Sequence, residues 1–480
     1  MNRRMVLFLL GRVMLTEAIL MLLPCLVAVI YRESSVVAFF PAIFIALALG
    51  VIFSAKRPAN HVFYAKEGFI TVALSWILIS AVGALPFYIS GEIPSYTDSL
   101  FEMVSGFTTT GASILKNVEA LSKCMLFWRS FSHWIGGMGV LVFLLAIVPT
   151  SGGYSMNLMK AESPGPSVGK LAPKLSTTAK NLYIMYFGLT VVEIVLLCLG
   201  DMHIFDAMLI SFGTAGTGGF AVLNTSLESY SAYIQVVVTV FMILFGVNFT
   251  VYFYLFYERN IKKVLKSEEL RWYIIIILAS VILITLDITP MYDSVSEAWH
   301  QAAFQVGSII TTTGFSTTDF NLWPEFSRVL LIILMFFGAC AGSTGGGFKI
   351  SRVVLLVKTM FREFGHIMHP RSVKAVTLDG KKIEHSVARS LTAFFVAYVL
   401  VMGLSVLLIS GDGFDFTTNV SAVMATLNNI GPGLEVVGPM GNYSGFSVFA
   451  KYVLIFDMLA GRLELFPMLM LFVPKAWKKQ

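Results

Sequence analysis

Ten long apolar segments follow one another along the chain, and they limit the fold more than any other feature of the sequence. Most of them reach the roughly 20 residues that a helix needs to cross the hydrocarbon core of a bilayer. Charged residues make up 13% of the 480 residues, about half the share that is typical of soluble domains. The sequence therefore predicts a polytopic, all-α membrane protein, and it excludes a cytosolic enzyme and a disordered regulator. The predicted spans are residues 5–31, 36–53, 69–88, 125–148, 182–199, 232–257, 272–286, 329–341, 387–409 and 446–473.

Basic residues concentrate in alternate connections between these segments. Arg3 and Arg4 precede the first segment, and Lys475, Lys478 and Lys479 follow the last. Because basic residues mark the cytoplasmic side, ten spans place both termini in the cytoplasm. The net charge of +6 is thus interpreted as a topology signal, and no nucleic acid is expected as a partner. The outward connections hold few basic residues, among them Arg32, Lys116, Lys123, Arg129 and Arg328.

Four of the outward connections share one pattern that is too apolar for simple loops. Each has a helix-compatible segment of about eight to twelve residues, too short to cross a bilayer, followed by small residues around a glycine. A period of about one hundred residues, found four times, indicates four copies of one unit. The short segments are residues 99–107, 205–212, 298–309 and 420–427, and the glycines are Gly111, Gly219, Gly314 and Gly431.

Each unit is predicted to contain a span, a short helix, a glycine loop and a second span. Irregular backbone at membrane depth is tolerated only where protein buries it or where it lines a watery cavity. Four such loops can converge on one axis, and a ring of carbonyl groups can replace the hydration shell of an alkali cation. Glycine suits the turn because it allows positive φ and adds no side chain to the lumen. A single Thr-Thr-Thr-Gly cluster is more typical of helix packing, but the fourfold recurrence favours a central pore.

The repeats divide the chain into seven predicted segments. The first, residues 1–67, is an additional pair of transmembrane helices. The others are pore repeat 1 (68–150), a cytoplasmic loop (151–180), pore repeat 2 (181–258), pore repeat 3 with a broken second span (259–357), a second cytoplasmic loop (358–386), and pore repeat 4 with the cytoplasmic tail (387–480).

The eighth apolar segment is interrupted by glycines. Each glycine costs a helix about 1 kcal/mol relative to alanine, so the helix is expected to open here, and a simple packing kink is the alternative. Gly342 and Gly347 have the spacing of a nucleotide-binding P-loop, but Phe348 stands where that motif requires lysine, which excludes it. The glycines within the stretch 329–357 are Gly338, Gly342, Gly345, Gly346 and Gly347.

The four loops, with Thr-Thr-Thr-Gly-Phe-Ser at 311–316, resemble those of the Trk/Ktr/HKT superfamily of potassium transporters. The two additional N-terminal spans and the sequence Gly-Ser-Thr-Gly-Gly-Gly-Phe-Lys at 342–349 resemble in particular the bacterial TrkH family. The resemblance covers essentially the whole chain. It implies potassium uptake across the bacterial inner membrane by a homodimer in which four units surround one pore within each protomer.

The resemblance also implies which residues form a carbonyl-lined selectivity filter for K⁺ and an intramembrane gate below it. The fourth loop departs from the threonine-rich pattern, with Asn429 and Pro432 beside the filter positions, so its neighbouring contacts are less defined. The implied filter residues are Thr110, Gly111, Gly218, Gly219, Thr313, Gly314, Ile430 and Gly431. The implied gate residues are Ala341, Gly342, Ser343, Thr344, Gly345, Gly346, Gly347 and Lys349.

Arg462, within the last apolar segment, is implied to lie close below this filter. An intramembrane arginine is costly and usually faces a partner or a cavity. A positive charge at that place would raise the barrier to cation passage, which makes Arg462 a further gating residue. The alternative is a structural pair with Asp457 or Glu464. For Glu17 and Glu193, helix-packing hydrogen bonds or interfacial positions are expected rather than a proton relay.

A ring-forming cytosolic subunit of the TrkA type, which binds nucleotides, is the implied regulatory partner, docked on the two cytoplasmic loops. No cofactor and no catalytic residues are expected in this chain, because its seven histidines lack ligand spacing, and K⁺ is the substrate ion. The alternative function is a secondary transporter that carries a small organic solute by alternating access, although such proteins show two related halves rather than four units. Coupling of the flux to protons or sodium is left open.

Overall fold

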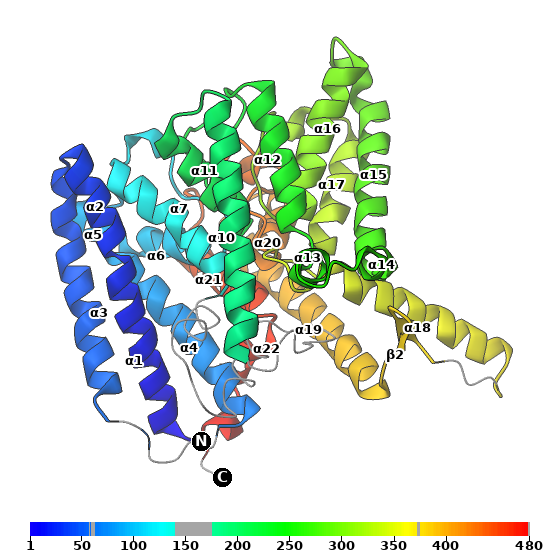
Figure 1. Ribbon diagram of the computed structural model, residues 1–480, viewed down its shortest axis with the longest axis horizontal. Helices are drawn as coiled ribbons and strands as arrows, with labels where there is room; N and C mark the ends of the chain where they lie inside the picture. Colours follow the sequence, from blue (N-terminus) through cyan, green and yellow to red (C-terminus); the bar gives the residue numbers. More distant parts are fainter. Residues whose placement is uncertain (57, 59–62, 140–174, 372–374, 479–480) are drawn as a thin grey trace.

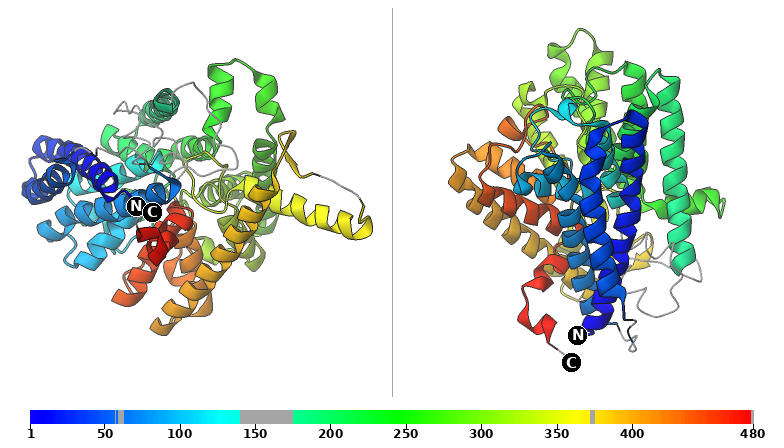
Figure 2. Two further views of the ribbon diagram at one scale, coloured as in Figure 1. Left: turned by 90° about the horizontal axis from the view of Figure 1, so that it is seen from below. Right: turned by 90° about the vertical axis from the view of Figure 1, so that its left-hand side faces the viewer.

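The computed structural model describes residues 1–56, 58, 63–139, 175–371 and 375–478. Helices stand side by side in one bundle, and the two chain termini lie close together at one end (Figures 1 and 2). Within the described residues, six helical stretches are long and apolar enough to cross a membrane, which makes the chain a multi-pass membrane protein. They are Arg3–Tyr31, Ser34–Ser54, Ala65–Ser90, Lys180–Leu199, Glu268–Met291 and Ser386–Asp412.

The N-terminal helices form a hairpin at one edge of the bundle (Figure 1). Helix α1 packs along α3 and against α4, and a side chain at Gly11 would overlap the backbone of Gly50. The Glu33 carboxylate accepts hydrogen bonds from the backbone N–H groups of Lys123 and Cys124, at 2.7 and 2.9 Å. It therefore caps the first turn of α7 and joins the hairpin to the first unit. The elements are α1 (Arg3–Leu20), α2 (Leu22–Tyr31), the 3₁₀ helix η1 (Ser34–Ala38) and α3 (Phe39–Ser54).

The rest of the chain repeats one order of elements four times: long helix, short helix, irregular loop, second long helix. This order confirms the predicted helical fold class. Unit 1 has α4 (Ala65–Gly83), α5 (Leu85–Ser90), α6 (Tyr96–Phe107), η2 (Val118–Ala120) and α7 (Lys123–Gly137). Unit 2 has α10 (Leu175–Leu199), α11 (Ile204–Gly216), α12 (Ala232–Phe245) and α13 (Phe249–Phe256). Unit 3 has α14 (Ile261–Lys266), α15 (Glu268–Ile288), η3 (Thr289–Met291), α16 (Val295–Ile310), η4 (Phe320–Leu322), α17 (Glu325–Phe337) and α18 (Ile350–Met368). Unit 4 has α19 (His385–Ile409), η5 (Ser410–Asp412), α20 (Phe416–Leu427), η6 (Glu435–Val437), α21 (Val448–Arg462), α22 (Phe466–Leu471) and η7 (Pro474–Trp477).

The four units close into a ring. The second long helix of each unit packs against the short helix of the next: α7 on α11, α12 on α16, α17 on α20, and α21 back on α6. Figure 2 shows this course from below, where the chain runs around a common centre. The short helices lie in the interior, and residues 101–107 and 421–427 are buried throughout.

In units 2 and 4 the second long helices are shorter than the sequence predicts. The predicted span 232–257 is two helices, α12 and α13, bent by 93°, and the span 446–473 divides into α21 and α22. The span 125–148 is described only as α7 and its following residues. Glycines near the ends of α7 and α21 allow close packing on the short helices: side chains at Gly136 and Gly461 would overlap the carbonyl oxygens of Phe107 and Leu427, the last residues of α6 and α20.

The stretch 358–386, predicted as a cytoplasmic loop, contains regular structure. Helix α18 continues to Met368, and strands β1 (Thr377–Leu378) and β2 (Lys381–Lys382) form an antiparallel hairpin. Asp379 and Gly380 both have positive φ, as the two-residue turn of a tight hairpin requires. Most of the other loop, 151–180, lies outside the described residues, and α10 begins at Leu175 rather than at residue 182.

Candidate functional site

Each short helix begins at a capping side chain and leads into a loop. Ser95, His203, Ser294 and Asp415 accept a hydrogen bond from a backbone N–H group of the first turn of α6, α11, α16 and α20. Because these caps begin the helices, the four short helices start slightly earlier than the apolar pattern predicts. Their C-terminal ends carry the partial negative charge of the helix dipole toward the four loops.

The four loops touch one another in a closed ring. A side chain at Gly111 would overlap the carbonyl oxygen of Gly218, one at Gly219 that of Thr313, one at Gly314 that of Ile430, and one at Gly431 the backbone of loop 1 beside Thr110. Each glycine thus faces the residue that precedes the glycine of the next loop. The structure brings together all eight implied filter residues, which we call the loop ring: Thr110, Gly111, Gly218, Gly219, Thr313, Gly314, Ile430 and Gly431. On the side of the outer connections, a cavity lined by all four glycines opens above the loop ring.

The same two backbone positions have positive φ in every loop. The glycines Gly111, Gly219, Gly314 and Gly431 have φ of 79°, 75°, 86° and 98°, which glycine adopts without strain. Two residues earlier, φ is also positive, between 54° and 61°, at Thr109, Thr217, Thr312 and Asn429. Such a conformation costs a residue with a side chain of the order of 1–3 kcal/mol and persists only where the surroundings enforce it. The sequence predicted the glycines but not these strained neighbours.

Side-chain hydroxyl groups support the loops from behind. In loop 1 the hydroxyl oxygens of Thr108 and Thr110 lie 2.8 Å apart, and in loop 3 those of Thr311 and Thr313 lie at the same distance. In loop 4 the Asn429 amide donates to the Thr110 hydroxyl and to the Met458 carbonyl, both at 2.9 Å. Asn429, the residue by which the fourth loop departs from the threonine pattern, therefore forms a hydrogen bond that links loop 4 to loop 1.

A buried ion pair behind loops 1 and 2 was missed at the level of sequence. Arg129 was assigned to an outward connection, but it lies within α7, is 2% exposed and contacts the Glu102 carboxylate at 2.7 Å. The guanidinium also donates to the Ala221 carbonyl at 3.1 Å and lies 3.4 Å from the ring centre of Phe220. Glu102 accepts a further hydrogen bond from the Ile114 N–H group. A carboxylate in the apolar α6 segment was the available signal, because buried charges need partners.

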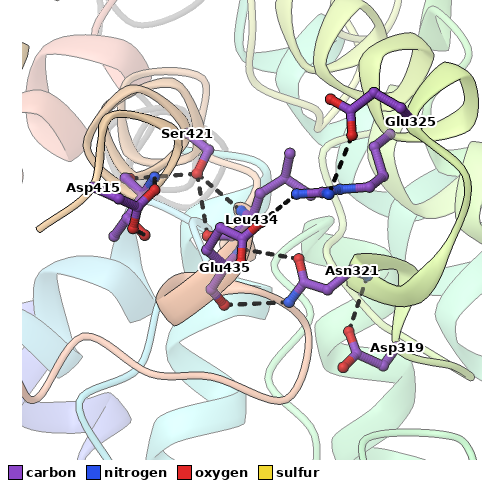
Figure 3. A network of polar contacts seen from close by, with 9 residues as sticks. Asp319, Asn321, Glu325, Asp415, Ser421, Leu434 and Glu435 are labelled. Atoms are coloured by element: carbon purple, nitrogen blue, oxygen red, sulfur yellow. Dashed lines mark hydrogen bonds and ion pairs between the residues drawn. The ribbon is translucent and has the colours of Figure 1, made fainter.

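Polar contacts join the outer connections of units 3 and 4 (Figure 3). Asn321 accepts from the Glu435 N–H group at 2.9 Å and donates to the Glu435 carbonyl at 3.2 Å. Arg328 contacts the carboxylates of Glu435 and Glu325. The other three boundaries are bridged in the same layer by Asn224 with Asn117, by Leu227 with Ser316, and by Tyr443 with Ser113.

The break between α17 and α18 lies directly against the loop ring. The Gly346 N–H group donates to the Thr312 hydroxyl at 2.7 Å, and a side chain at Gly346 would approach the Asn428 carbonyl oxygen. The implied gate residues therefore contact loops 3 and 4. We call residues 341–349 the gate segment, and residues 342, 343, 345–347 and 349 line a second cavity together with Arg462.

Backbone hydrogen bonds hold the gate segment against the bend between α12 and α13. The Cys340 N–H group donates to the Gly246 carbonyl at 3.1 Å, and the Phe249 N–H group donates to the Gly342 carbonyl at 3.0 Å. From α15, the Glu269 carboxylate accepts from the N–H group of Ala341 at 2.7 Å. The bent helix of unit 2 therefore serves as the support of the gate segment.

Two cationic side chains reach carbonyl groups of the gate segment. The Lys349 ammonium donates to the carbonyls of Gly345 and Gly346, and the Arg462 guanidinium donates to the Thr344 carbonyl at 2.8 Å. Arg462 also donates to the Gly136 and Gly137 carbonyls at the end of α7. It therefore ties the gate segment to unit 1.

The carboxylates considered as partners of Arg462 have other contacts. Glu464 forms an ion pair with Arg352, and Asp457 accepts a hydrogen bond from the Ser405 hydroxyl at 2.7 Å.

Phe348 is the apolar anchor of the gate segment. Its ring is stacked on Phe336, with centroids 5.0 Å apart, and it contacts Phe394, Phe395 and Tyr398 edge-on or tilted. The Tyr398 hydroxyl forms a hydrogen bond with the Asn428 side chain at the end of α20. In the sequence, Phe348 was informative only as the residue that excludes a P-loop, and its packing was not predicted.

A membrane bundle whose four re-entrant loops meet in one backbone-lined ring defines the class of pore-loop membrane proteins. A family model described as TrkH, cation transport protein, matches residues 35–479. The chain belongs to this TrkH family, as the motifs at 311–316 and 342–349 indicated.

Relatives and a solved structure agree with this assignment over the whole chain. The chain is 40% identical to the Trk system potassium uptake protein TrkH of Salmonella typhimurium over 96% of both chains. It is 38% identical to the protein of the same name from Vibrio parahaemolyticus over the full length of both. It is also similar to the crystal structure of the potassium transporter TrkH from Vibrio parahaemolyticus, with a TM-score of 0.89, 36% identity and complete coverage of both chains.

Proposed function

We propose that this chain takes up potassium across the bacterial inner membrane through the loop ring. The closed ring of four glycine loops is the observation that carries the proposal, because such a ring offers backbone carbonyls on every side of one axis. The relatives named as potassium uptake proteins support K⁺ as the ion. Carbonyl groups would replace its hydration shell, and the four helix ends would favour a cation over an anion.

The gate segment is proposed to close the pathway below the loop ring. Its contact with Thr312 and the approach of Lys349 and Arg462 to its carbonyls support this role. Two positive charges next to the path oppose the passage of a cation. Opening would require the Gly346–Thr312 hydrogen bond to break and the segment to move away from loops 3 and 4.

Regulation and assembly are also proposed on the pattern of the family. A ring-forming cytosolic subunit of the TrkA type would control the gate segment from the cytoplasm, and two copies of this chain would form a homodimer. Helix α18 supports an interface, because it projects from the bundle (Figure 1) and exposes Phe361, Ile367 and Met368 to 62%, 76% and 69%. Exposed apolar surface of this kind marks contact sites. The neighbouring, basic termini support a cytoplasmic position for both chain ends.

Rubidium uptake into proteoliposomes of the purified chain, driven by a potassium gradient, tests the proposal. Gly314→Ser is expected to alter or abolish uptake, because its side chain would overlap the Ile430 carbonyl. Gly413→Ser is the matched control: Gly413 has a similar φ of 79° but no atom within 4 Å of the added side chain. A variant lacking residues 343–346 of the gate segment is expected to raise uptake. Absence of uptake by the wild type and by the deletion variant alike would contradict an autonomous pore.

A further inference from the structure

Tyr443, in the connection between α20 and α21, contacts the loop ring itself. Its side chain is buried, and its hydroxyl donates a hydrogen bond to the Gly431 carbonyl at 2.7 Å. The aromatic ring packs between Phe101 of α6 and Phe446, with centroids 5.5 and 5.9 Å away. The Tyr443 N–H group donates to the Ser113 carbonyl at 2.8 Å. Contacts from units 1 and 4 therefore fix the position of the hydroxyl.

This contact distinguishes the fourth loop from the others. Within the described residues, no hydrogen bond reaches the carbonyl oxygens of Gly111, Gly219 or Gly314. The polar groups behind loops 2 and 3 reach residues that follow the glycine, as Arg129 reaches the Ala221 carbonyl. In loop 4 the support acts at the glycine carbonyl, which belongs to the loop ring.

The local sequence of loop 4 explains why the Gly431 carbonyl needs support from a side chain. Pro432 follows Gly431 directly and has no N–H group to bond with the surrounding protein. Gly431 also has the largest positive φ of the four glycines, 98°. We propose that Tyr443 is a positioning residue that fixes the Gly431 carbonyl and thereby sets how well the loop ring discriminates between cations.

The inference rests on the proposed function and adds a determinant of ion specificity to it. Without the hydroxyl, the Gly431 carbonyl is free to move toward a smaller ion. Its oxygen also no longer shares its lone pairs with a hydrogen-bond donor, so it is a stronger ligand for that ion. Selectivity by cavity size and selectivity by ligand field strength both then predict a gain for Na⁺ relative to K⁺. The sign of the expected effect is therefore the same under either account.

Tyr443→Phe removes the hydroxyl and keeps the ring. The ratio of sodium to potassium uptake in proteoliposomes is expected to rise about fivefold, as for the loss of one hydrogen bond. Tyr252→Phe is the matched control, because the Tyr252 hydroxyl also bonds a carbonyl at 2.7 Å, that of Leu244, which lies outside the loop ring. A ratio of two ions does not depend on the amount of protein, so a general loss of stability would not change it.

An unchanged ratio in Tyr443→Phe, with normal potassium uptake, would overturn the inference and leave the proposed function standing. Absence of potassium uptake by the wild type would overturn both. If Tyr443→Phe does not accumulate, a fluorinated tyrosine at position 443 provides a second test. Its more acidic hydroxyl is a stronger donor, so the ratio is expected to fall below that of the wild type, and an unchanged ratio would again overturn the inference.

Discussion

Glu102 and Arg129 join loops 1 and 2 through a buried ion pair. Both side chains are almost completely buried, and the carboxylate also holds the backbone of loop 1 at Ile114. In a buried pair the two charges compensate for each other's lost hydration, so the loss of one leaves the other in an environment that cannot stabilise it. The pair is therefore expected to be essential for the geometry of the loop ring.

Glu102→Gln is expected to lower the free energy of unfolding by about 3–5 kcal/mol, because Arg129 is left buried without its counter-charge. Thermal unfolding of the purified protein in detergent measures the effect. The control is Glu435→Gln, which disrupts a partly exposed pair with Arg328 and is expected to cost about 0–1 kcal/mol. Equal unfolding temperatures for the two variants would contradict the role of the buried pair.

Arg462→Gln is expected to raise rubidium uptake about fivefold or more, because it removes a positive charge that faces the gate segment. Glutamine is shorter than arginine and loses the hydrogen bond to the Thr344 carbonyl as well, so Arg462→Lys, which keeps the positive charge without the guanidinium, is measured beside it and is expected to leave uptake low. The matched control, Arg389→Gln, changes an exposed arginine of α19 and is expected to leave uptake unchanged. Unaltered uptake in both glutamine variants would show that Arg462 holds the structure without opposing the ion.

At this scale the sequence predicted the glycines well and their surroundings poorly. Gly111 and Gly314 were recognisable because they recur at a regular spacing. The positive φ of Thr109 and Asn429 was not recognisable, because it belongs to the left-handed turn that ends each short helix, where glycine is the usual residue. In this turn the N–H groups of Thr110 and Ile430 donate to the carbonyls of Ser105 and Ala425. The burial of Arg129 could not be read from its neighbours either, because its partner is supplied by α6.

At the scale of the elements, the sequence predicted which helices exist better than it predicted where they begin and bend. The start of α6 was missed by a few residues although Ser95 and Asp98 form a recognisable helix start, which a search for caps would have found. The opening between α17 and α18 was predicted from its glycines. The bend between α12 and α13 was not, because Gly246 and Asn248 interrupt an otherwise continuous apolar segment only briefly.

The gate segment is the element whose mobility matters most to the account. Phe348→Ala removes the ring that packs against Phe336 and Tyr398, and such truncations cost about 3–5 kcal/mol where the cavity does not collapse. Because the anchored element is the gate segment, basal rubidium uptake is expected to rise severalfold while the ratio of sodium to potassium uptake stays constant.

Phe44→Ala, at an exposed position of α3, is the control for that experiment and is expected to behave like the wild type. A Phe348→Ala protein that unfolds at a lower temperature but takes up rubidium at the normal rate would contradict the gating role. A change in the ion ratio would mean that Phe348 acts on the loop ring instead of on the gate segment.

For the whole molecule, hydrophobic segments and their repeat predicted the helical class and the four-unit order. The predicted central pore requires the fourth unit to return to the first, and α21 does pack on α6. The sequence did not indicate which helices make that contact, because the apolar residues of a span do not distinguish one protein neighbour from another. Nor did it indicate that Asn429 bonds Thr110 across the boundary of the last and first units. Such closure is a property of all four units together.

The central claim is that the loop ring binds one cation on its axis. Anomalous diffraction from crystals of the protein grown with rubidium or thallium measures this most directly. We expect a peak in contact with backbone carbonyl oxygens of the loop ring, that of Gly431 among them, and its loss in Gly314→Ser but not in Gly413→Ser. Ordered loops without a peak on the axis, or a peak only at carboxylates elsewhere, would contradict it.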